Sequence, residues 1–265
     1  MHINVFDHYQ NQATAAHRLD PRVKVVIVVV FILSNALLPD GAWLAYGVMG
    51  LLVLAAARVA HLPFGFLFKR SLIVLPFLLA AITIVFTLPG TAVFSFSIGA
   101  WTFTATDAGL VRFASILIRS WLSVMAAIWL TATTPFPDLM HALRHLHVPA
   151  ILVSIISFMY RYLFVMADEA KRLLRAREAR SARLPGQTGS GGSLWWRAKI
   201  AGGIVGQLFL RSFDRSDRVY NAMLARGYRG ELLTMNPHHM VQRDWLVGGT
   251  AVGLILLVQI VSRLG

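Results

Sequence analysis

Apolar residues run along the chain in long blocks, and charged and turn-forming residues gather between the blocks. Five blocks approach the length of a bilayer-spanning helix, which needs about 17–25 mostly apolar residues. They are Val23–Leu38, Trp43–Ala57, Ser71–Leu88, Gly109–Thr131 and Trp245–Val261. A further apolar stretch, Pro149–Ala167, is interrupted by Arg161. The pattern predicts an all-α integral membrane protein with about five transmembrane helices.

Basic residues are spread unevenly among the segments between these blocks. The loops Pro39–Ala42 and Pro89–Ala108 contain neither Lys nor Arg, whereas residues 168–243 carry fourteen Lys and Arg against six Asp and Glu. Because cytoplasmic loops are enriched in Lys and Arg, we expect the N-terminus and this basic region to be cytoplasmic. On this topology Pro149–Ala167 does not cross the membrane and is an interfacial or buried helix.

The charge placement divides the chain into three predicted parts. Residues 1–131 form an N-terminal membrane region with four spans. Residues 132–243 form a cytoplasmic region, and residues 244–265 form the final transmembrane helix. The polar segment Met1–Arg22 has no apolar core of a signal peptide, so we expect a multi-pass protein with no cleaved leader.

Composition narrows the class of protein further. With 57% hydrophobic and 14% charged residues and a mean hydropathy of +0.63, the chain departs from soluble domains. The net charge of +13 suits anionic lipid or an acidic partner protein, and for so apolar a chain we expect no nucleic-acid partner. The absence of cysteine excludes disulfides, thiolate metal sites and cysteine nucleophiles.

Candidate catalytic and metal-binding residues are few. Gly186–Ser193 is rich in glycine but lacks the lysine of a phosphate-binding P-loop, so it is typical of a flexible linker. His141 and His145 have i,i+4 spacing, which binds a metal only when a third ligand joins them. No Asp or Glu follows in helical register on that face. The sequence therefore predicts a protein without catalytic activity, metal site or cofactor of its own.

Two arginines interrupt the fourth apolar block. Arg112 and Arg119 are seven residues apart, so they lie on one face of the predicted helix. Buried charge in a membrane is costly and often functional. The two side chains either line a polar seam or contact a partner, or they extend towards the membrane surface.

Two long helices are predicted in the basic region, and each ends on an Ala-Arg-x pattern. The first can run from Ala150 to about Arg183, and the second ends after Ala225 at a C-terminal glycine, Gly227. The patterns are Ala179-Arg180-Ser181, with Arg177 in Ala176-Arg177-Glu178 as an alternative, and Ala225-Arg226-Gly227. A small residue lets a partner's backbone approach, so that the guanidinium can bind carboxylates or carbonyls in a groove. The alternative interpretation is a solvated basic face at the lipid boundary.

Further short motifs follow one another along the chain. Leu-Asp-Pro-Arg-Val-Lys occupies positions 19–24, Thr133-Thr134-Pro135 precedes Val148-Pro149, and Tyr160-Arg161-Tyr162 follows. Together with the paired Ala-Arg-x patterns, this ordered set resembles the T-component (EcfT) family of energy-coupling factor transporters. The ending Arg226-Gly227-Tyr228-Arg229-Gly230 is most similar to the CbiQ branch, which serves cobalt or nickel uptake.

This resemblance implies a scaffold of the bacterial cytoplasmic (inner) membrane, without catalysis of its own. Its partners would be two ABC-type ATPase subunits, which bind ATP, and a small substrate-capturing membrane protein, the S component. The S component would be CbiM-like, with or without a CbiN-like subunit. In the family two long coupling helices cross, and each places its arginine in a groove of one ATPase. The resemblance gives the second coupling role to Ala225, Arg226 and Gly227, and the first to Ala179, Arg180 and Ser181 or to Arg177.

Other functions remain open from the residues alone. A stand-alone secondary transporter needs inverted repeats and polar groups at the membrane midplane, and the sequence shows no convincing repeat. A membrane enzyme acting on lipid headgroups needs paired acids or a nucleophile with its base, and none is evident. A T component could also serve a vitamin instead of a metal ion, because the selective site would lie in another chain.

Overall fold

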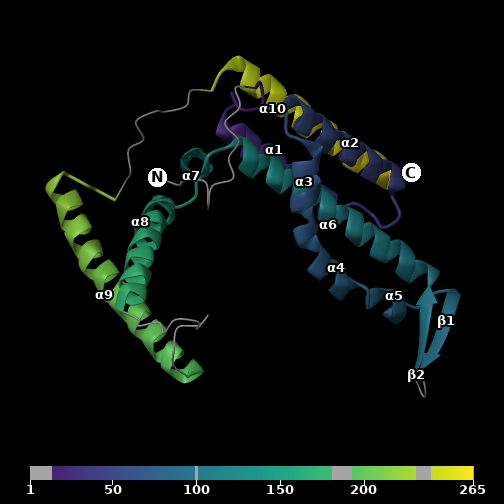
Figure 1. The fold of residues 1–265 in the computed structure, drawn as a ribbon. Coiled ribbons are helices and arrows are strands. Elements are labelled where there is room, and N and C mark those ends of the chain that lie inside the picture. Colours follow the sequence, from purple (N-terminus) through teal and green to yellow (C-terminus); the bar gives the residue numbers. More distant parts are fainter. Residues whose placement is uncertain (1–13, 99–100, 181–192, 231–239, 265) are drawn as a thin grey trace. The chain divides into compact units, whose positions relative to one another are not determined.

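The computed structural model describes residues 14–98, 101–180, 193–230 and 240–264 (Figure 1). Helices make up most of these residues, and the contacts among them separate two compact units. One unit consists of His2–His145 and Asn236–Gly265, and the other spans Leu146–Met235. The first contains helices α1–α7, α10 and a β-hairpin, and the second contains the long helices α8 and α9.

Helix α1 (Pro21–Ala36) begins at start signals present in its own sequence. The Asp20 side chain accepts a hydrogen bond of 2.8 Å from the backbone N–H of Arg22. Pro21 occupies the first helical position, where the missing N–H costs nothing. The Leu-Asp-Pro-Arg motif is therefore a helix N-terminus.

Lys24 fixes the beginning of α1 to the rest of the membrane unit. Its side chain is only 1% exposed, and Nζ donates to the carbonyl oxygens of His17 at 3.2 Å and Thr133 at 3.1 Å. The carboxylates of Asp138, Asp20 and Asp244 interact electrostatically with the ammonium group. A buried lysine is tolerated only with such partners. It joins the start of α1 to the end of α6 (Asp107–Thr133).

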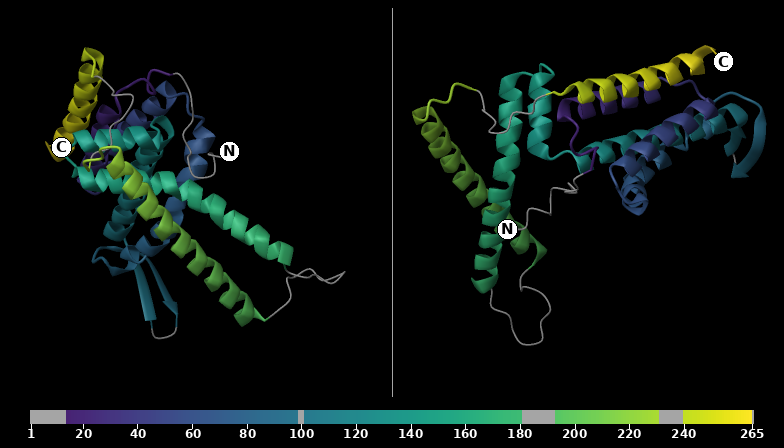
Figure 2. Two further views of the ribbon diagram at one scale, coloured as in Figure 1. Left: turned by 90° about the vertical axis from the view of Figure 1, so that its left-hand side faces the viewer. Right: turned by 90° about the horizontal axis from the view of Figure 1, so that it is seen from above.

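Four apolar helices build the core of this unit. Helix α1 packs against α6 and against α10 (Gln242–Leu264), and α2 (Trp43–Val59) also packs against α6. Figure 2 shows α10 lying alongside α1. The buried centre is made of Val28, Phe31, Tyr46, Met49, Val53, Ala126 and Ile255. Many of the remaining apolar side chains face outwards, as expected for helices whose surroundings are lipid.

The third predicted span is broken into short pieces. The sequence predicts one helix over Ser71–Leu88, but the structure has α3 (Phe64–Ser71), a 3₁₀ turn (Leu72–Val74), α4 (Leu75–Ala81) and α5 (Ile84–Thr87). The segments Phe64–Phe77 and Leu79–Thr87 are bent by 41° relative to each other. Pro76 lacks a backbone N–H and opposes a straight helix at this point. Thr83 Oγ1 donates to the carbonyl of Ala80 at 3.1 Å, which competes with the helical pattern between α4 and α5.

A β-hairpin follows α5, where the sequence predicts only an uncharged loop. Strand β1 (Ala92–Ile98) pairs antiparallel with β2 (Trp101–Thr106), and the register shifts between Ala92 and Phe94. These strands are rich in Phe, Trp and Thr, which favour extended backbone. They are the only strands in the described part of the chain.

Arg112 and Arg119 both contact Asp40, which lies in the turn between α1 and α2. Arg112 Nε is 3.7 Å from Asp40 Oδ2, and Arg119 forms an ion pair with Asp40 Oδ1. Arg119 also donates to the carbonyl of Leu38 at 3.0 Å. Of the interpretations left open by the sequence, the structure favours a polar seam, because the two arginines hold this turn against α6.

The short helix α7 (Phe136–His145) belongs to the same unit. It packs against α1, and its buried residues are Met140, His141 and Ala142. Arg22 Nη2 donates to His141 Nε2 at 3.1 Å, and the rings of His141 and His145 are 4.6 Å apart. The histidine pair is therefore part of the contact between α7 and α1.

The helices are those of an all-α integral membrane protein, with the hairpin as a small addition. By length and composition α6, α8 and α10 could each cross a membrane, and the bent segment from α3 to α5 could form a fourth span. Helices α1 and α2 have 16 and 17 residues, or about 24–26 Å at 1.5 Å per residue, close to the thickness of the hydrocarbon core. Because α8 is among the helices long and apolar enough to cross, the structure does not decide whether its apolar part spans the membrane. The topology with five spans therefore stays a prediction.

Candidate functional site

The candidate site lies on two long helices that pack against each other. Helix α8 (Ala150–Arg180) contains no Gly or Pro, and α9 (Leu194–Ala225) begins where the Ser193 side chain accepts a hydrogen bond of 3.3 Å from the N–H of Trp196. Their bounds agree closely with the two helices that the sequence predicts. Contacts early in α8 involve residues after the end of α9, and contacts late in α8 involve the middle of α9. The two helices therefore run antiparallel (Figures 1 and 2).

An ion-pair cluster joins the helices beyond the apolar half of α8. Glu169 of α8 forms an ion pair with Arg211 of α9, and its second oxygen is 3.0 Å from Arg172, one turn along α8. The hydrogen bond from Arg211 lowers the pKa of the Glu169 carboxyl below its usual 4.5, and the charges of Arg172 and Arg211 act in the same direction. Glu169 is therefore charged at neutral pH.

The first Ala-Arg-x pattern lies at the end of α8. Ala179 and Arg180 are exposed and are its last two residues, and Arg177, one turn earlier, is half-buried. Ser181 lies outside the described residues. Either arginine can extend beyond the helix end, so both Arg180 and Arg177 stay predictions for the first coupling position.

The second pattern forms the C-terminus of α9. Ala225 is the last helical residue, Arg226 is the C-cap, and Gly227 has a φ of +82°. The N–H of Gly227 donates to Leu224 O at 2.9 Å, and the N–H of Tyr228 donates to Met223 O at 3.0 Å. This is a Schellman turn, which satisfies two helix-end carbonyls and requires a left-handed residue after the cap. The prediction that Gly227 ends the helix is confirmed, and the turn leaves Arg226 exposed.

The chain after this turn returns to α8, a contact that the sequence analysis missed. The Tyr228 ring packs edge-on against Phe158, with centroids 6.5 Å apart, and Ser154 Oγ donates to Gly230 O at 3.4 Å. Phe158 also stacks with Tyr162, an element of the Tyr-Arg-Tyr motif. The only available signal was this set of aromatic residues, which does not by itself say which of them meet.

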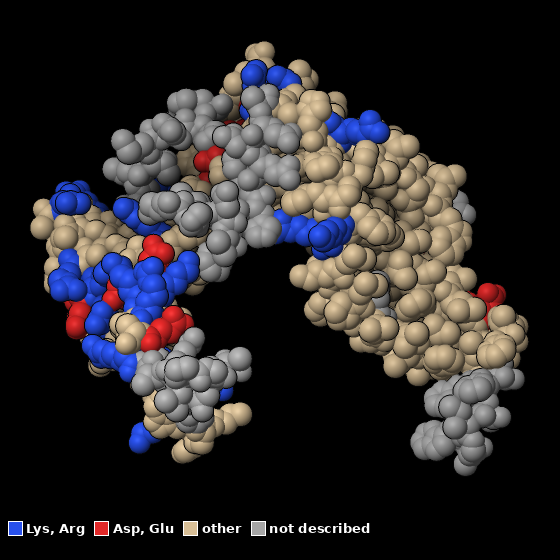
Figure 3. Space-filling model, in the orientation of Figure 1, with Lys and Arg blue, Asp and Glu red and all other residues tan. Residues whose placement is uncertain are grey.

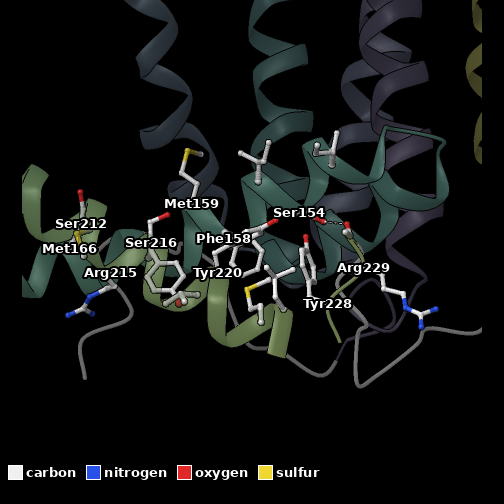
Figure 4. A pocket seen from close by; sticks show the side chains of 17 residues that line it. Ser154, Phe158, Met159, Met166, Ser212, Arg215, Ser216, Tyr220, Tyr228 and Arg229 are labelled. Carbon is white, nitrogen blue, oxygen red and sulfur yellow. Dashed lines mark hydrogen bonds between the residues drawn. The ribbon is translucent and has the colours of Figure 1, made fainter. Parts of the chain in front are cut away.

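A groove of about 790 Å³ lies between the helices, and this returning segment forms part of its lining (Figure 4). Apolar and aromatic side chains dominate its lining, among them Ile155, Phe158, Tyr162, Met223 and Tyr228. Lys and Arg side chains gather on the outside of α8 and α9 (Figure 3). The site thus combines an apolar groove with a basic exterior and an exposed arginine at each helix end.

Among the residues that the structure describes, no group of three or more His, Cys, Asp or Glu side chains could hold a metal ion. The exposed guanidinium groups are suited instead to binding carboxylates and carbonyl oxygens of another protein.

Comparisons with known proteins give this geometry a context. The family model CbiQ, described as a cobalt transport protein, matches residues 12–236. The energy-coupling factor transporter transmembrane protein EcfT of Acidaminococcus fermentans is 30% identical over 255 residues, which cover 91% of this chain and 90% of the relative. The cobalt transport protein CbiQ of Salmonella typhimurium is 29% identical over 185 residues, which cover 66% of this chain and 78% of the relative.

Proposed function

The chain belongs to the EcfT/CbiQ family of energy-coupling factor transporter membrane components, and from this premise we propose that it is the scaffold that transmits ATPase motion to a substrate-binding S component. It forms a complex with two ABC-type ATPase subunits and with a small CbiM-like membrane protein, with or without a CbiN-like subunit. The chain itself is not an enzyme, because ATP is bound and hydrolysed by the partners. We place it in the bacterial cytoplasmic membrane, with its N-terminus and the α8–α9 unit in the cytoplasm.

The observation that carries the proposal is the position of the two arginine motifs on the antiparallel pair. Arg180 lies 11 residues beyond Glu169, and Ala225 lies 14 residues beyond Arg211. At about 1.5 Å per residue, the motifs are roughly 16 Å and 21 Å from the ion pair, in opposite directions along the helices. Two exposed arginines so separated suit two separate partner subunits.

The two motifs have matching roles in this proposal. Arg226, flanked by Ala225 and Gly227, inserts into a groove of one ATPase. Arg180, flanked by Ala179 and Ser181, inserts into the other, and Arg177 is the alternative for this position. Small flanking residues let each groove approach the helix end, and each guanidinium binds carboxylates or carbonyls there. Closure of the ATPases then changes the angle between α8 and α9.

We propose cobalt or nickel as the transported substrate. The matched family is described as a cobalt transport protein, and one relative is a CbiQ cobalt transport protein. Other relatives carry the name EcfT without a substrate, so a vitamin is the alternative. In either case the selective site belongs to the S component.

The test is copurification and uptake with the full chain. The tagged chain is expressed with its chromosomal neighbours, solubilised mildly and pulled down, and uptake of Co²⁺, Ni²⁺ and candidate vitamins is measured in the same cells. We expect the double variant Arg180→Ala/Arg226→Ala to lose the ATPases and uptake, while the S component still binds its substrate. The variant Arg175→Ala/Arg218→Ala removes two exposed arginines of the same helices and serves as the matched control.

Two results would contradict the proposal. Uptake that survives the double motif variant would remove the assigned role of these arginines. Gradient-driven uptake by the chain alone in ATP-depleted vesicles would instead identify a secondary transporter. Single Arg177→Ala and Arg180→Ala variants decide which arginine occupies the first position.

A further inference from the structure

The β-hairpin lies within the longest uncharged part of the chain. From Ser71 to Thr106 the sequence contains no Lys, Arg, His, Asp or Glu. This segment includes α4, α5 and both strands, and it ends where α6 begins at Asp107. An uncharged segment of this length is unusual at a surface that faces only water.

The strand register separates apolar from hydroxyl-bearing positions. Phe94, Phe96 and Ile98 of β1 pair with Ala105, Phe103 and Trp101 of β2. The alternate positions, Ser95 and Ser97, pair with Thr104 and Thr102. Because successive strand residues belong to opposite faces and paired residues share a face, one face of the hairpin is apolar and the other carries hydroxyl residues.

The base of the hairpin is firmly attached to the helices. Thr106 Oγ1 donates to Leu88 O at 2.9 Å, and the N–H of Asp107 donates to Thr91 O at 3.1 Å. Gly109 allows close approach, since a β-carbon there would be 2.7 Å from Val85 O. The hairpin therefore has a defined orientation relative to α5 and the start of α6 (Figure 1).

Exposed apolar side chains occur on the hairpin and also on the two short helices that precede it. Ala105 is buried where β2 contacts α5, whereas Phe94, its cross-strand partner, is 65% exposed. Leu79 of α4 and Phe86 of α5 are also exposed, by 69% and 42%. On the face that Figure 3 draws, the described residues beside the hairpin show almost no Lys or Arg side chains.

We propose that the two paired strands of this hairpin, β1 and β2, form a membrane anchor that lies in the lipid interface at the N-terminal end of α6. The apolar face is directed towards the acyl chains, and the hydroxyl face is directed towards headgroups and water. Aromatic side chains favour this depth. The outer edge of each strand has backbone N–H and C=O groups with no partner in the described sheet. Because such groups are unfavourable in the hydrocarbon core, the hairpin stays at the interface. Its rigid base then sets the depth of α5 and α6.

The test uses the natural absence of cysteine, which allows one spin label at each chosen position of the full chain. Single cysteines replace Phe94, Ser95, Phe96 and Ser97, and the labelled protein is reconstituted in phosphatidylcholine–phosphatidylglycerol vesicles. Collision rates are measured with oxygen, which concentrates in the bilayer, and with a water-soluble nickel chelate. We expect the oxygen-to-chelate ratio to alternate, high at 94 and 96 and low at 95 and 97.

Two other patterns would overturn the proposal. Chelate access at all four positions would place the hairpin in water. Low access to both reagents at 94 and 96 would mean that protein, a partner or a second copy, covers the apolar face. If labelling disturbs the hairpin, the pair Phe96→Lys and Ser97→Lys repeats the test, because only Phe96→Lys should lower the thermal unfolding midpoint in vesicles. Equal effects of the two lysines would refute the anchor.

Discussion

Replacing Gly227 by alanine tests the backbone geometry of the turn that ends α9 beside the α8–α9 groove. Gly227 has a φ of +82°, and among the described residues a β-carbon built there meets no other atom within 4 Å. The substitution therefore introduces no clash, and its whole effect comes from forcing an L-residue into the left-handed region. That conformation costs about 1–2 kcal/mol for a residue other than glycine. The Schellman turn should open about 5–30 times more often as a result.

Gly202 supplies a matched control in the same helix. A β-carbon there also meets nothing within 4 Å among the described residues, but Gly202 lies in the interior of α9 with ordinary helical geometry. Gly202→Ala should therefore stabilise the helix by about 1 kcal/mol. Gly227→Asn is a second control, because asparagine tolerates the left-handed region better than alanine.

Amide hydrogen exchange measures the turn directly. The N–H groups of Gly227 and Tyr228 donate to Leu224 O and Met223 O, so their exchange reports the opening of the turn. We expect faster exchange in peptides covering residues 226–230 for Gly227→Ala, a smaller change for Gly227→Asn and none for Gly202→Ala. Equal rates for Gly227→Ala and the unmodified chain would refute the reasoning, since the turn would then not depend on the glycine.

Three further predictions concern positions whose surroundings the structure defines. Lys24→Met leaves two buried carbonyl oxygens without their hydrogen-bond donor and should lower the free energy of unfolding by about 3 kcal/mol. Lys69→Met, at an exposed position, should change the free energy of unfolding by less than about 0.5 kcal/mol. Thermal unfolding in detergent compares the two variants, and equal midpoints would contradict the burial argument. Gly109→Ala forces a β-carbon against a carbonyl oxygen of α5 and should destabilise the membrane unit by about 2 kcal/mol, which the same assay checks. The lowered pKa of Glu169 means that its ion pair with Arg211 stabilises the α8–α9 contact above pH 4.5 and is lost as the pH falls through the folded-state pKa. In the unmodified chain, protection of α8 and α9 amides from hydrogen exchange should therefore decrease at acidic pH, and Glu169→Gln should abolish this decrease. The same dependence of protection on pH in the variant and in the unmodified chain would contradict the prediction.

Local sequence signals can fix the end of a helix, because capping depends on residues within one turn of it. Gly227 was predicted to end α9, and it does. The first span was predicted to begin at Val23, whereas Asp20 and Pro21 start α1 two residues earlier. The long uninterrupted α8 followed from the absence of Gly and Pro. These features need no knowledge of the rest of the chain.

The sequence alone did not predict which residues far apart in the chain contact one another. Asp40 pairs with both Arg112 and Arg119 only because α1, α2 and α6 pack together. Tyr228 meets Phe158 only because the Schellman turn reverses the chain towards α8. The hairpin was missed because its short alternation of Ser and Phe lies in a segment that charge alone classified as a loop.

The Glu169–Arg211 ion pair and the contact of Tyr228 with Phe158 connect α8 and α9 in different ways. The difference determines how a movement of one helix would be passed to the other. The Glu169–Arg211 ion pair lies near the surface, where water screens it, so a change of crossing angle meets little resistance there. The other connection runs through Tyr228, which lies two residues after Arg226 and packs on Phe158. A partner that moves Arg226 in the proposed scaffold would therefore also move α8 through this contact. In the proposed scaffold, Tyr228→Ala should keep the ATPases in the copurified complex but lower uptake. Loss of the ATPases together with uptake would mean that Tyr228 serves binding at Arg226 rather than transmission to α8, and unchanged uptake would show that transmission does not use this contact.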